Sequence, residues 1–181
     1  HTKLETLYKL LSGNMSGNRM DLETYVQRYY LEKILYAANR RFANMSAGQF
    51  ELRMVDEENA GKGKNRGLDL MVYSNVTGKE REVRTLSGGE SFMAALALAL
   101  GMADQIQESS AAIHLDVMFV DEGFGSLDPE TLDKAMNTLM DLQKGGRLVG
   151  IISHVAELKE RIPAQLIVTG GVMGSHASFR V

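Results

Sequence analysis

The chain has 181 residues, of which 44% are hydrophobic and 24% charged, and its net charge is −3. This balance is typical of a folded, soluble domain and excludes a disordered chain. The absence of cysteine excludes disulfides, thiolate zinc sites and cysteine nucleophiles. No apolar run approaches the ~20 residues needed to cross a bilayer, and the acidic balance limits any nucleic-acid contact to a local patch. We therefore expect a cytoplasmic protein that does not span a membrane.

The beginning of the chain predicts two helices separated by a polar linker. Apolar side chains recur at helical spacing within the first helix, at Leu4, Leu7, Tyr8 and Leu11. The stretch 12–18 is rich in Gly, Ser and Asn and ends this helix. A longer helix is predicted from Asp21, its N-cap, to about Asn44. Its expected buried stripe consists of Leu22, Val26, Tyr30, Ile34, Ala38 and Phe42.

The next segments predict two strands, at residues 50–55 and 68–73. A Gly-rich loop at residues 61–67 joins them and carries Lys62, Lys64 and Arg66. Solvation is the favoured explanation of these basic residues, and contact with DNA phosphates is the alternative.

The second half alternates helices and strands, which indicates α/β architecture. A long helix is predicted to open at Ser87, and another runs from Pro129 to about Gly145. The apolar runs 117–120 and 148–152 predict strands that are buried on both faces. A short helix and two closing strands, 166–169 and 177–181, complete the predicted order.

Two adjacent carboxylates, Asp121 and Glu122, directly follow the predicted strand 117–120. Such a strand delivers charge to the carboxyl edge of a sheet, where α/β proteins bind ligands. Asp121 would bind a magnesium ion, and Glu122 would polarise an attacking water. The alternative is that the strand simply ends at acidic loop residues.

The tetrapeptide Ser87-Gly88-Gly89-Glu90 precedes the long helix. Ser and Glu at this spacing form a capping box, which needs no ligand. A cap does not require two glycines, however, and their presence suggests that something approaches the backbone closely. Exposed amides at a helix N-terminus bind anions, of which phosphate is the usual one.

Two further residues lie near the predicted sheet edge. Asp128 precedes Pro129 and predicts an N-cap, with any role in binding being additional. His154 follows the strand 148–152, at the same predicted edge as the paired carboxylates. It is either a surface residue or a contact for a γ-phosphate.

The order of these motifs resembles the signature motif, Walker B motif, D-loop and switch histidine of ABC-type ATPases. They are the segments 86–90, 118–122, 126–128 and 153–154. The flanking segments 85–101, 119–128 and 146–154 closely resemble the SbcC family, the ATPase subunits of bacterial SbcCD DNA-repair nucleases. The resemblance is strong from about Asp21 onward, whereas residues 1–19 match only as the end of a coiled coil and a linker.

The resemblance implies the C-terminal lobe, residues 20–181, of an ABC-type ATPase head. Its fold would be α/β, a mainly parallel sheet flanked by helices, with a coiled-coil exit helix before it. No stretch of these 181 residues reads G-x-x-x-x-G-K-[ST], the pattern of a phosphate-binding loop. In the family that loop lies in an N-terminal lobe beyond the coiled coil. The fragment alone would therefore lack ATPase activity.

By the family pattern, ATP and Mg²⁺ are the expected cofactors. Asp121, Glu122 and His154 would complete a site begun by the chain's own N-terminal lobe. Ser87, Gly88, Gly89, Glu90 and Asp128 would contact ATP, the signature residues contacting nucleotide held by a second head. Expected partners are that lobe, a second head, an SbcD-type nuclease and double-stranded DNA. The alternatives are a chromosome-organising or recombination ATPase without a nuclease, and a non-enzymatic interaction domain.

Overall fold

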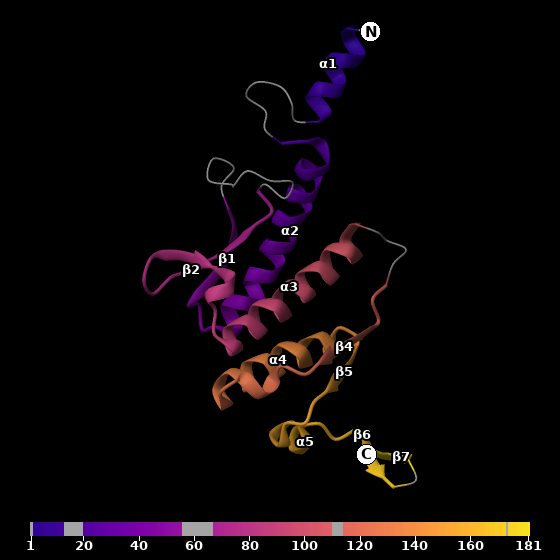
Figure 1. Cartoon of the computed structure of the whole chain (residues 1–181). Coiled ribbons are helices and arrows are strands. Elements are labelled where there is room, and N and C mark those ends of the chain that lie inside the picture. The colour runs from indigo at the N-terminus through magenta and orange to yellow at the C-terminus, as the bar shows by residue number, and fades with distance from the viewer. Residues whose placement is uncertain (1, 13–19, 56–66, 110–113, 173) are drawn as a thin grey trace.

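The computed structural model describes residues 2–12, 20–55, 67–109, 114–172 and 174–181. The loop carrying Lys62, Lys64 and Arg66 lies outside the described residues. Figure 1 shows the chain running from α1 (Thr2–Leu11) at one end to the hairpin β6–β7 at the other. Between them, α2 (Leu22–Met45) and α3 (Gly88–Ser109) pack against each other. Among the described residues, no helix has both the length and the hydropathy of a membrane span.

The helix α2 begins as predicted but buries less of its stripe than expected. The Asp21 side chain accepts a hydrogen bond from the Thr24 amide at 2.7 Å, which caps the helix. Ala38 and Phe42 are fully buried, whereas Leu22, Val26 and Tyr30 are exposed. The prediction is wrong for these three because α3 packs against the later turns of α2, where Gly101 meets the backbone of residues 34–38.

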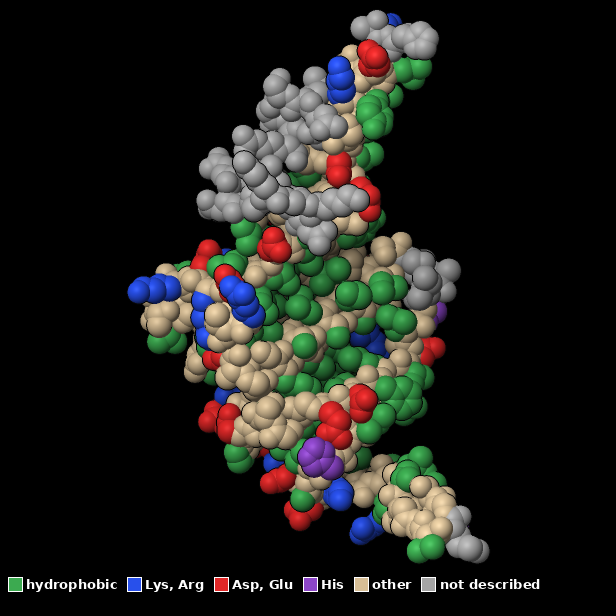
Figure 2. All heavy atoms as spheres, in the orientation of Figure 1, with side chains coloured by type: hydrophobic (Ala, Val, Ile, Leu, Met, Phe, Trp, Pro, Cys, Tyr) green, Lys and Arg blue, Asp and Glu red, His purple; other side chains and the backbone are tan. Residues whose placement is uncertain are grey.

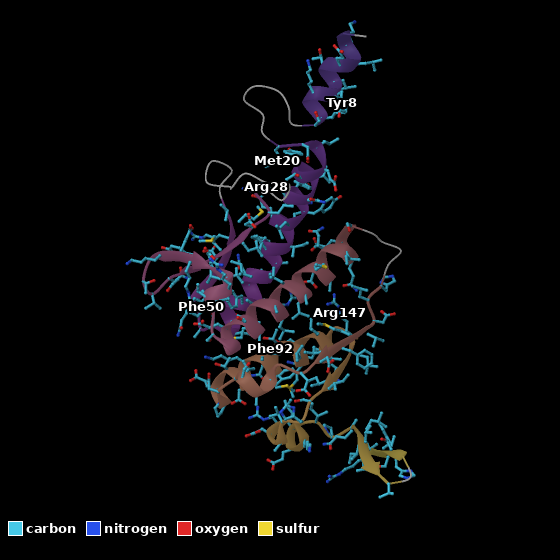
Figure 3. All side chains as sticks on the ribbon, in the orientation of Figure 1. Tyr8, Met20, Arg28, Phe50, Phe92 and Arg147 are labelled. Atoms are coloured by element: carbon cyan, nitrogen blue, oxygen red, sulfur yellow. The ribbon has the colours of Figure 1, made fainter. Side chains whose placement is uncertain are left out.

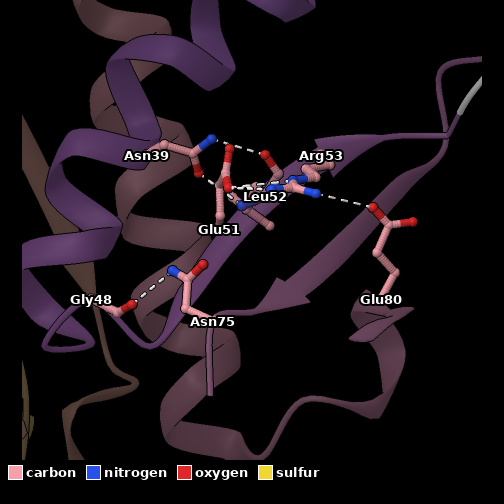
Figure 4. A network of polar contacts seen from close by, with 7 residues as sticks. All are labelled: Asn39, Gly48, Glu51, Leu52, Arg53, Asn75 and Glu80. Atoms are coloured by element: carbon pink, nitrogen blue, oxygen red, sulfur yellow. Dashed lines mark hydrogen bonds and ion pairs between the residues drawn. The ribbon is translucent and has the colours of Figure 1, made fainter. Parts of the chain in front are cut away.

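A small antiparallel sheet packs beside the end of α2 in the order β1-β2-β3. Its strands are β1 (Phe50–Met54), β2 (Leu70–Ser74) and β3 (Lys79–Glu82). The Asn39 side chain on α2 bonds both the amide and the carbonyl of Leu52 at 2.8 Å, as Figure 4 shows. The strand β3 was not predicted, because its four residues are all charged and show no apolar alternation.

The predicted parallel strands are β4 (Val117–Asp121) and β5 (Leu148–Ile152), connected through α4 (Pro129–Lys144). Parallel pairing needs such a helical crossover. The other two sheets are antiparallel, so the expected parallel pairing is confined to β4–β5 within the described residues. The short connection between β2 and β3 explains one of these exceptions, since only residues 75–78 separate them.

The β4–β5 pair is covered on one face only, which contradicts the prediction of strands buried on both faces. Val120 is buried, and Met118, Val149 and Ile151 pack against the core. The alternate residues point to the opposite face, which is exposed. We call this surface the open face; it comprises Val117, Phe119, Leu148 and Ile152, which are 51%, 69%, 59% and 53% exposed.

The core lies where α2, α3 and α4 meet the first sheet and the turn after β4. Its most deeply buried side chains include Phe42, Leu52, Leu100, Phe124 and Leu139. The chain then continues through α5 (Ala156–Arg161) into β6 (Gln165–Gly171) and β7 (Gly174–Arg180). The predicted closing strands are thus confirmed as an antiparallel hairpin, in which Leu166 pairs with Phe179.

Candidate nucleotide site

The signature loop, defined here as residues 87–90, forms a complete capping box at the start of α3. The Glu90 amide donates to Ser87 Oγ at 3.3 Å, and the Ser87 amide donates to Glu90 Oε2 at 2.8 Å. Arg81 Nη2 donates to the same carboxylate oxygen at 3.0 Å. Burial raises the pKa of Glu90, but the Ser87 amide and the Arg81 guanidinium outweigh it and hold this pKa below its usual value.

The two glycines of the signature loop are explained in part by contacts within the chain. A Cβ atom added at Gly89 would lie 2.9 Å from the Ser126 carbonyl oxygen, and one at Gly88 would lie 3.3 Å from Ser126 Cβ. The close approach predicted from these glycines therefore includes the loop that follows β4. Their amides occupy the first turn of the helix, where no intrahelical acceptor is available.

A hollow of about 530 Å³ opens beside the signature loop. The turn between α2 and β1 forms one wall, and the first turns of α4 form another. The residues that line it and were predicted to bind ATP are Ser87, Gly88, Gly89, Glu90 and Asp128. A larger hollow of about 750 Å³, between α2, α3 and α4, contains none of the predicted site residues.

Asp128 forms the N-cap of α4, as predicted. Its carboxylate accepts hydrogen bonds from the Thr131 amide at 3.0 Å and the Thr131 hydroxyl at 2.7 Å. Both bonds lower the pKa of Asp128, and the bond from the Thr131 hydroxyl has the larger effect. Asp128 lines the same hollow as the signature loop.

The turn after β4 has an unusual backbone. Glu122 adopts φ +56° and Gly123 φ +93°, so two consecutive residues lie in the left-handed region. A Cβ atom at Gly123 would lie 2.3 Å from the Phe92 ring, so only glycine fits there. The turn directs Phe124 into the core, where its ring lies 4.8 Å from that of Phe92. Figure 3 labels Phe92 on α3.

The turn also brings Glu122 to His154. Glu122 Oε2 lies 2.9 Å from His154 Nδ1, and the Glu122 amide donates to the Ile152 carbonyl at 2.9 Å. Both side chains are open to solvent, His154 being 80% exposed and Glu122 49%. The exposed Asp121 ends β4 at the same sheet edge. The structure thus brings together Asp121, Glu122 and His154, as predicted from their positions after parallel strands.

The predicted site residues therefore form two groups on this chain. Asp121, Glu122 and His154 lie at the sheet edge, whereas the other five surround the hollow. Within the described residues, no cluster of three or more His, Asp or Glu side chains is suited to hold a metal. Asp121 is compatible with Mg²⁺, which proteins commonly bind through one or two carboxylates together with phosphates and waters.

Sequence reasoning left Arg81 open between solvation and contact with DNA phosphates, and it missed both the Arg81–Glu90 contact and the Phe92–Phe124 pair. Arg81 lies on a charged strand with no periodic signal, although its distance of nine residues from Glu90 was visible. The aromatic pair joins α3 to the turn that carries Glu122, and nothing in the sequence indicated that the two rings meet.

Comparison with known proteins agrees with the resemblance seen in the sequence motifs. A family model described as SbcC/RAD50-like, Walker B motif, matches residues 49–141. The SbcC component of the nuclease SbcCD from Vibrio cholerae is 51% identical over 170 residues, covering 94% of this chain and 17% of that protein. The chain thus spans about a sixth of the length of this relative.

Solved structures of SMC ATPases resemble the chain. One, from a study of ATP-driven dimerisation and DNA-stimulated activation of these ATPases, has a TM-score of 0.62 at 18% identity. The alignment covers 87% of this chain and 89% of that structure's chain. The Smc head of Pyrococcus furiosus with its extended coiled coil, bound to a domain of ScpA, gives 0.61 at 17% identity. The alignment covers 98% of this chain and 40% of the Smc head.

Proposed function

The chain belongs to the SbcC/RAD50-like family, and from this we propose that it is the C-terminal half of an ATP-driven head. The head would dimerise on ATP and gate an SbcD-type nuclease that acts on double-stranded DNA ends and hairpins during repair. The observation that carries the proposal is the division of the site residues into two groups. Two ATP molecules sandwiched between two heads need such an arrangement, because each head contributes to both.

At the sheet edge, Glu122 is the proposed general base. It would polarise the water that attacks the γ-phosphate, while Asp121 would bind Mg²⁺, which neutralises phosphate charge. His154, already within 2.9 Å of Glu122, would orient that carboxylate and reach the γ-phosphate. The ATP would be held by the phosphate-binding loop of the chain's own N-terminal lobe.

At the hollow, the signature loop would bind ATP held by the second head. The amides of Gly88 and Gly89 and the hydroxyl of Ser87 are the proposed donors to its γ-phosphate. Glu90 and Asp128 line the same hollow. Nucleotide would then act as the adhesive between heads, and hydrolysis would separate them.

The open face supports the N-terminal lobe as a partner. All four apolar side chains of the open face are more than half exposed, and Phe119 is 69% exposed. Figure 2 shows further hydrophobic side chains gathered across the middle of the molecule over α3. On α3, Met102 and Ile106 are exposed. An apolar surface of this kind is typical of an interface that another lobe covers.

The decisive experiment is co-expression of this chain with the segment that carries the phosphate-binding loop. We expect a soluble complex with ATPase activity, whereas the 181-residue chain alone should hydrolyse no ATP. Phe119→Asp should prevent the two segments from co-purifying because it charges the open face. Tyr36→Asp is the matched control, since this exposed aromatic lies on α2. Robust hydrolysis by the pure chain alone would contradict the proposal that this chain supplies only part of each ATP site.

A chromosome-organising or recombination head without a nuclease is the second candidate. It is favoured by the similarity to the Smc head of Pyrococcus furiosus. Both candidates share the site, so the partner distinguishes them. We call the complex of this chain with the segment that carries the phosphate-binding loop the two-lobe head. Retention of an SbcD-type nuclease in a pull-down with the two-lobe head would support the first candidate. Its absence, with ATP-dependent dimerisation intact, would support the second.

A further inference from the structure

The guanidinium of Arg81 contacts both ends of the segment that carries the signature loop. We infer that Arg81 is a positioning residue, which acts through Glu90 to hold this loop in the conformation that engages ATP on a second head. The inference rests on the proposed function, because it assigns the loop that role. Arg81 itself is not proposed to touch nucleotide.

The geometry of the contacts defines this role. Arg81 Nη1 donates to the Thr85 carbonyl at 2.9 Å, and Nη2 donates to Glu90 Oε2 at 3.0 Å. The same Glu90 oxygen accepts the Ser87 amide at 2.8 Å. One planar side chain therefore fixes Thr85, two residues before the loop, and the Glu90 carboxylate that closes it. A capping box alone needs no arginine.

This arrangement determines which loop groups remain for a ligand. The Ser87 amide donates to Glu90 and the Ser87 hydroxyl oxygen accepts the Glu90 amide. The amides of Gly88 and Gly89 and the hydroxyl hydrogen of Ser87 remain as donors, on residues that line the hollow. Two adjacent glycines give the loop wide conformational freedom, which binding would have to restrict. By restricting it beforehand, Arg81 and Glu90 reduce the entropic cost of engaging the second head.

Arg81 is itself fixed to the core of the chain. It lies on β3 opposite Val72 of β2, a fully buried residue. Its guanidinium carbon lies 5.4 Å from the centroid of the Phe50 ring, which stacks on Phe42 of α2 at 6.1 Å. Arg81 and Phe50 thus connect the signature loop to Phe42 on the long helix α2.

Arg53 provides a matched control in the same sheet. It contacts Glu51 at 2.8 Å and Glu80 at 3.4 Å, as Figure 4 shows, and its guanidinium carbon lies 3.8 Å from the centroid of the Tyr73 ring. Its side chain is 39% exposed, against 36% for Arg81. Both arginines therefore bind carboxylates and an aromatic ring, but none of the contacts of Arg53 involves the signature loop.

The test compares these arginines in the full-length two-lobe head. Arg81→Ala should raise the protein concentration for half-maximal ATP-dependent dimerisation by about tenfold, the loss typical of one charge-assisted hydrogen bond. Binding of fluorescent ATP to single heads should stay unchanged, and Arg53→Ala should alter neither quantity. Arg81→Lys should give an intermediate loss, because one ammonium does not reproduce the two-pronged contact.

The outcomes separate the inference from the proposed function. If the unsubstituted head dimerises on ATP and Arg81→Ala behaves like Arg53→Ala, the positioning role is overturned. If the unsubstituted head does not dimerise on ATP, the proposed function itself fails. If Arg81→Ala unfolds at lower urea than Arg53→Ala, Arg81→Lys decides, since normal dimerisation of that variant at unchanged stability would also overturn the inference.

Discussion

The signature loop and the sheet edge are both predicted to contact ATP, but the chain supports them to different extents. The Glu90 carboxylate accepts hydrogen bonds from Ser87 and Arg81, and residues 126–127 pack against Gly88 and Gly89. At the sheet edge, the Glu122 and His154 side chains contact each other and are otherwise largely open to solvent. The open face lies on the same two strands.

The difference indicates which of the two half-sites depends on another part of the protein. The signature loop is bonded within this chain, so it is expected to keep its shape when the chain is isolated. The sheet edge has a fixed backbone, set by Phe124 and Gly123, but its functional side chains are exposed. On the proposed function, the N-terminal lobe would cover the open face and supply the nucleotide that these side chains contact.

The largest expected effect tests the sheet edge. In the two-lobe head, Glu122→Gln should lower the rate of ATP hydrolysis by about 10²- to 10³-fold, because the amide removes the general base. ATP-bound dimers should persist longer in the same variant. Steady-state hydrolysis and size-exclusion chromatography measure the two effects, with Glu157→Gln on α5 as the control. Normal turnover by Glu122→Gln would contradict the assignment of the base.

The corresponding test of the signature loop is Ser87→Arg. A long cationic side chain at the mouth of the hollow should block ATP-dependent dimerisation, while each head still binds ATP through its own lobe. Light scattering with and without ATP measures the first effect, and fluorescent nucleotide binding the second. Ser109→Arg, at the far end of α3, is the control. If Ser87→Arg dimerises normally, the loop is only a helix cap.

A smaller effect concerns the turn that positions Glu122. Gly123→Ala should lower the free energy of unfolding of the two-lobe head by about 3 kcal/mol, since a Cβ atom both collides with the Phe92 ring and strains a left-handed residue. Gly146→Ala is the matched control: its φ is also positive, at +88°, but no atom lies within 4 Å of the added Cβ. It should cost about 1 kcal/mol, the strain alone.

Urea unfolding of the two variants gives this comparison directly. Equal losses would show that the Phe92 ring yields without cost and that the turn is less restrained than its contacts indicate. A larger loss for Gly123→Ala, accompanied by slower hydrolysis, would show that the backbone at residues 122–123 contributes to the position of the general base.

Local signals in the sequence predicted most of this fold. Asp21 and Asp128 cap helices because short carboxylates bond the free amides of the first turn, which is a local effect. The burial of β4 and β5 was overestimated because an apolar run does not tell which face of a strand is covered, and one face of this pair is exposed. The contact between Arg81 and Glu90 was missed because tertiary pairing of β3, not local pattern, brings them together.

The smallest expected effect is a pH dependence of the signature loop. Hydrogen bonds lower the pKa of Glu90 in the folded chain below its usual value of 4.5. A lowered folded-state pKa contributes stability above pH 4.5, and this contribution is lost as the pH falls through the folded-state value. The midpoint of urea unfolding should therefore decline below pH 4.5, and Glu90→Gln should decline less steeply, because the amide does not titrate. Identical slopes would mean that the Glu90 carboxylate adds no stability beyond a neutral cap, and the contrast between the two half-sites would then rest on backbone contacts alone.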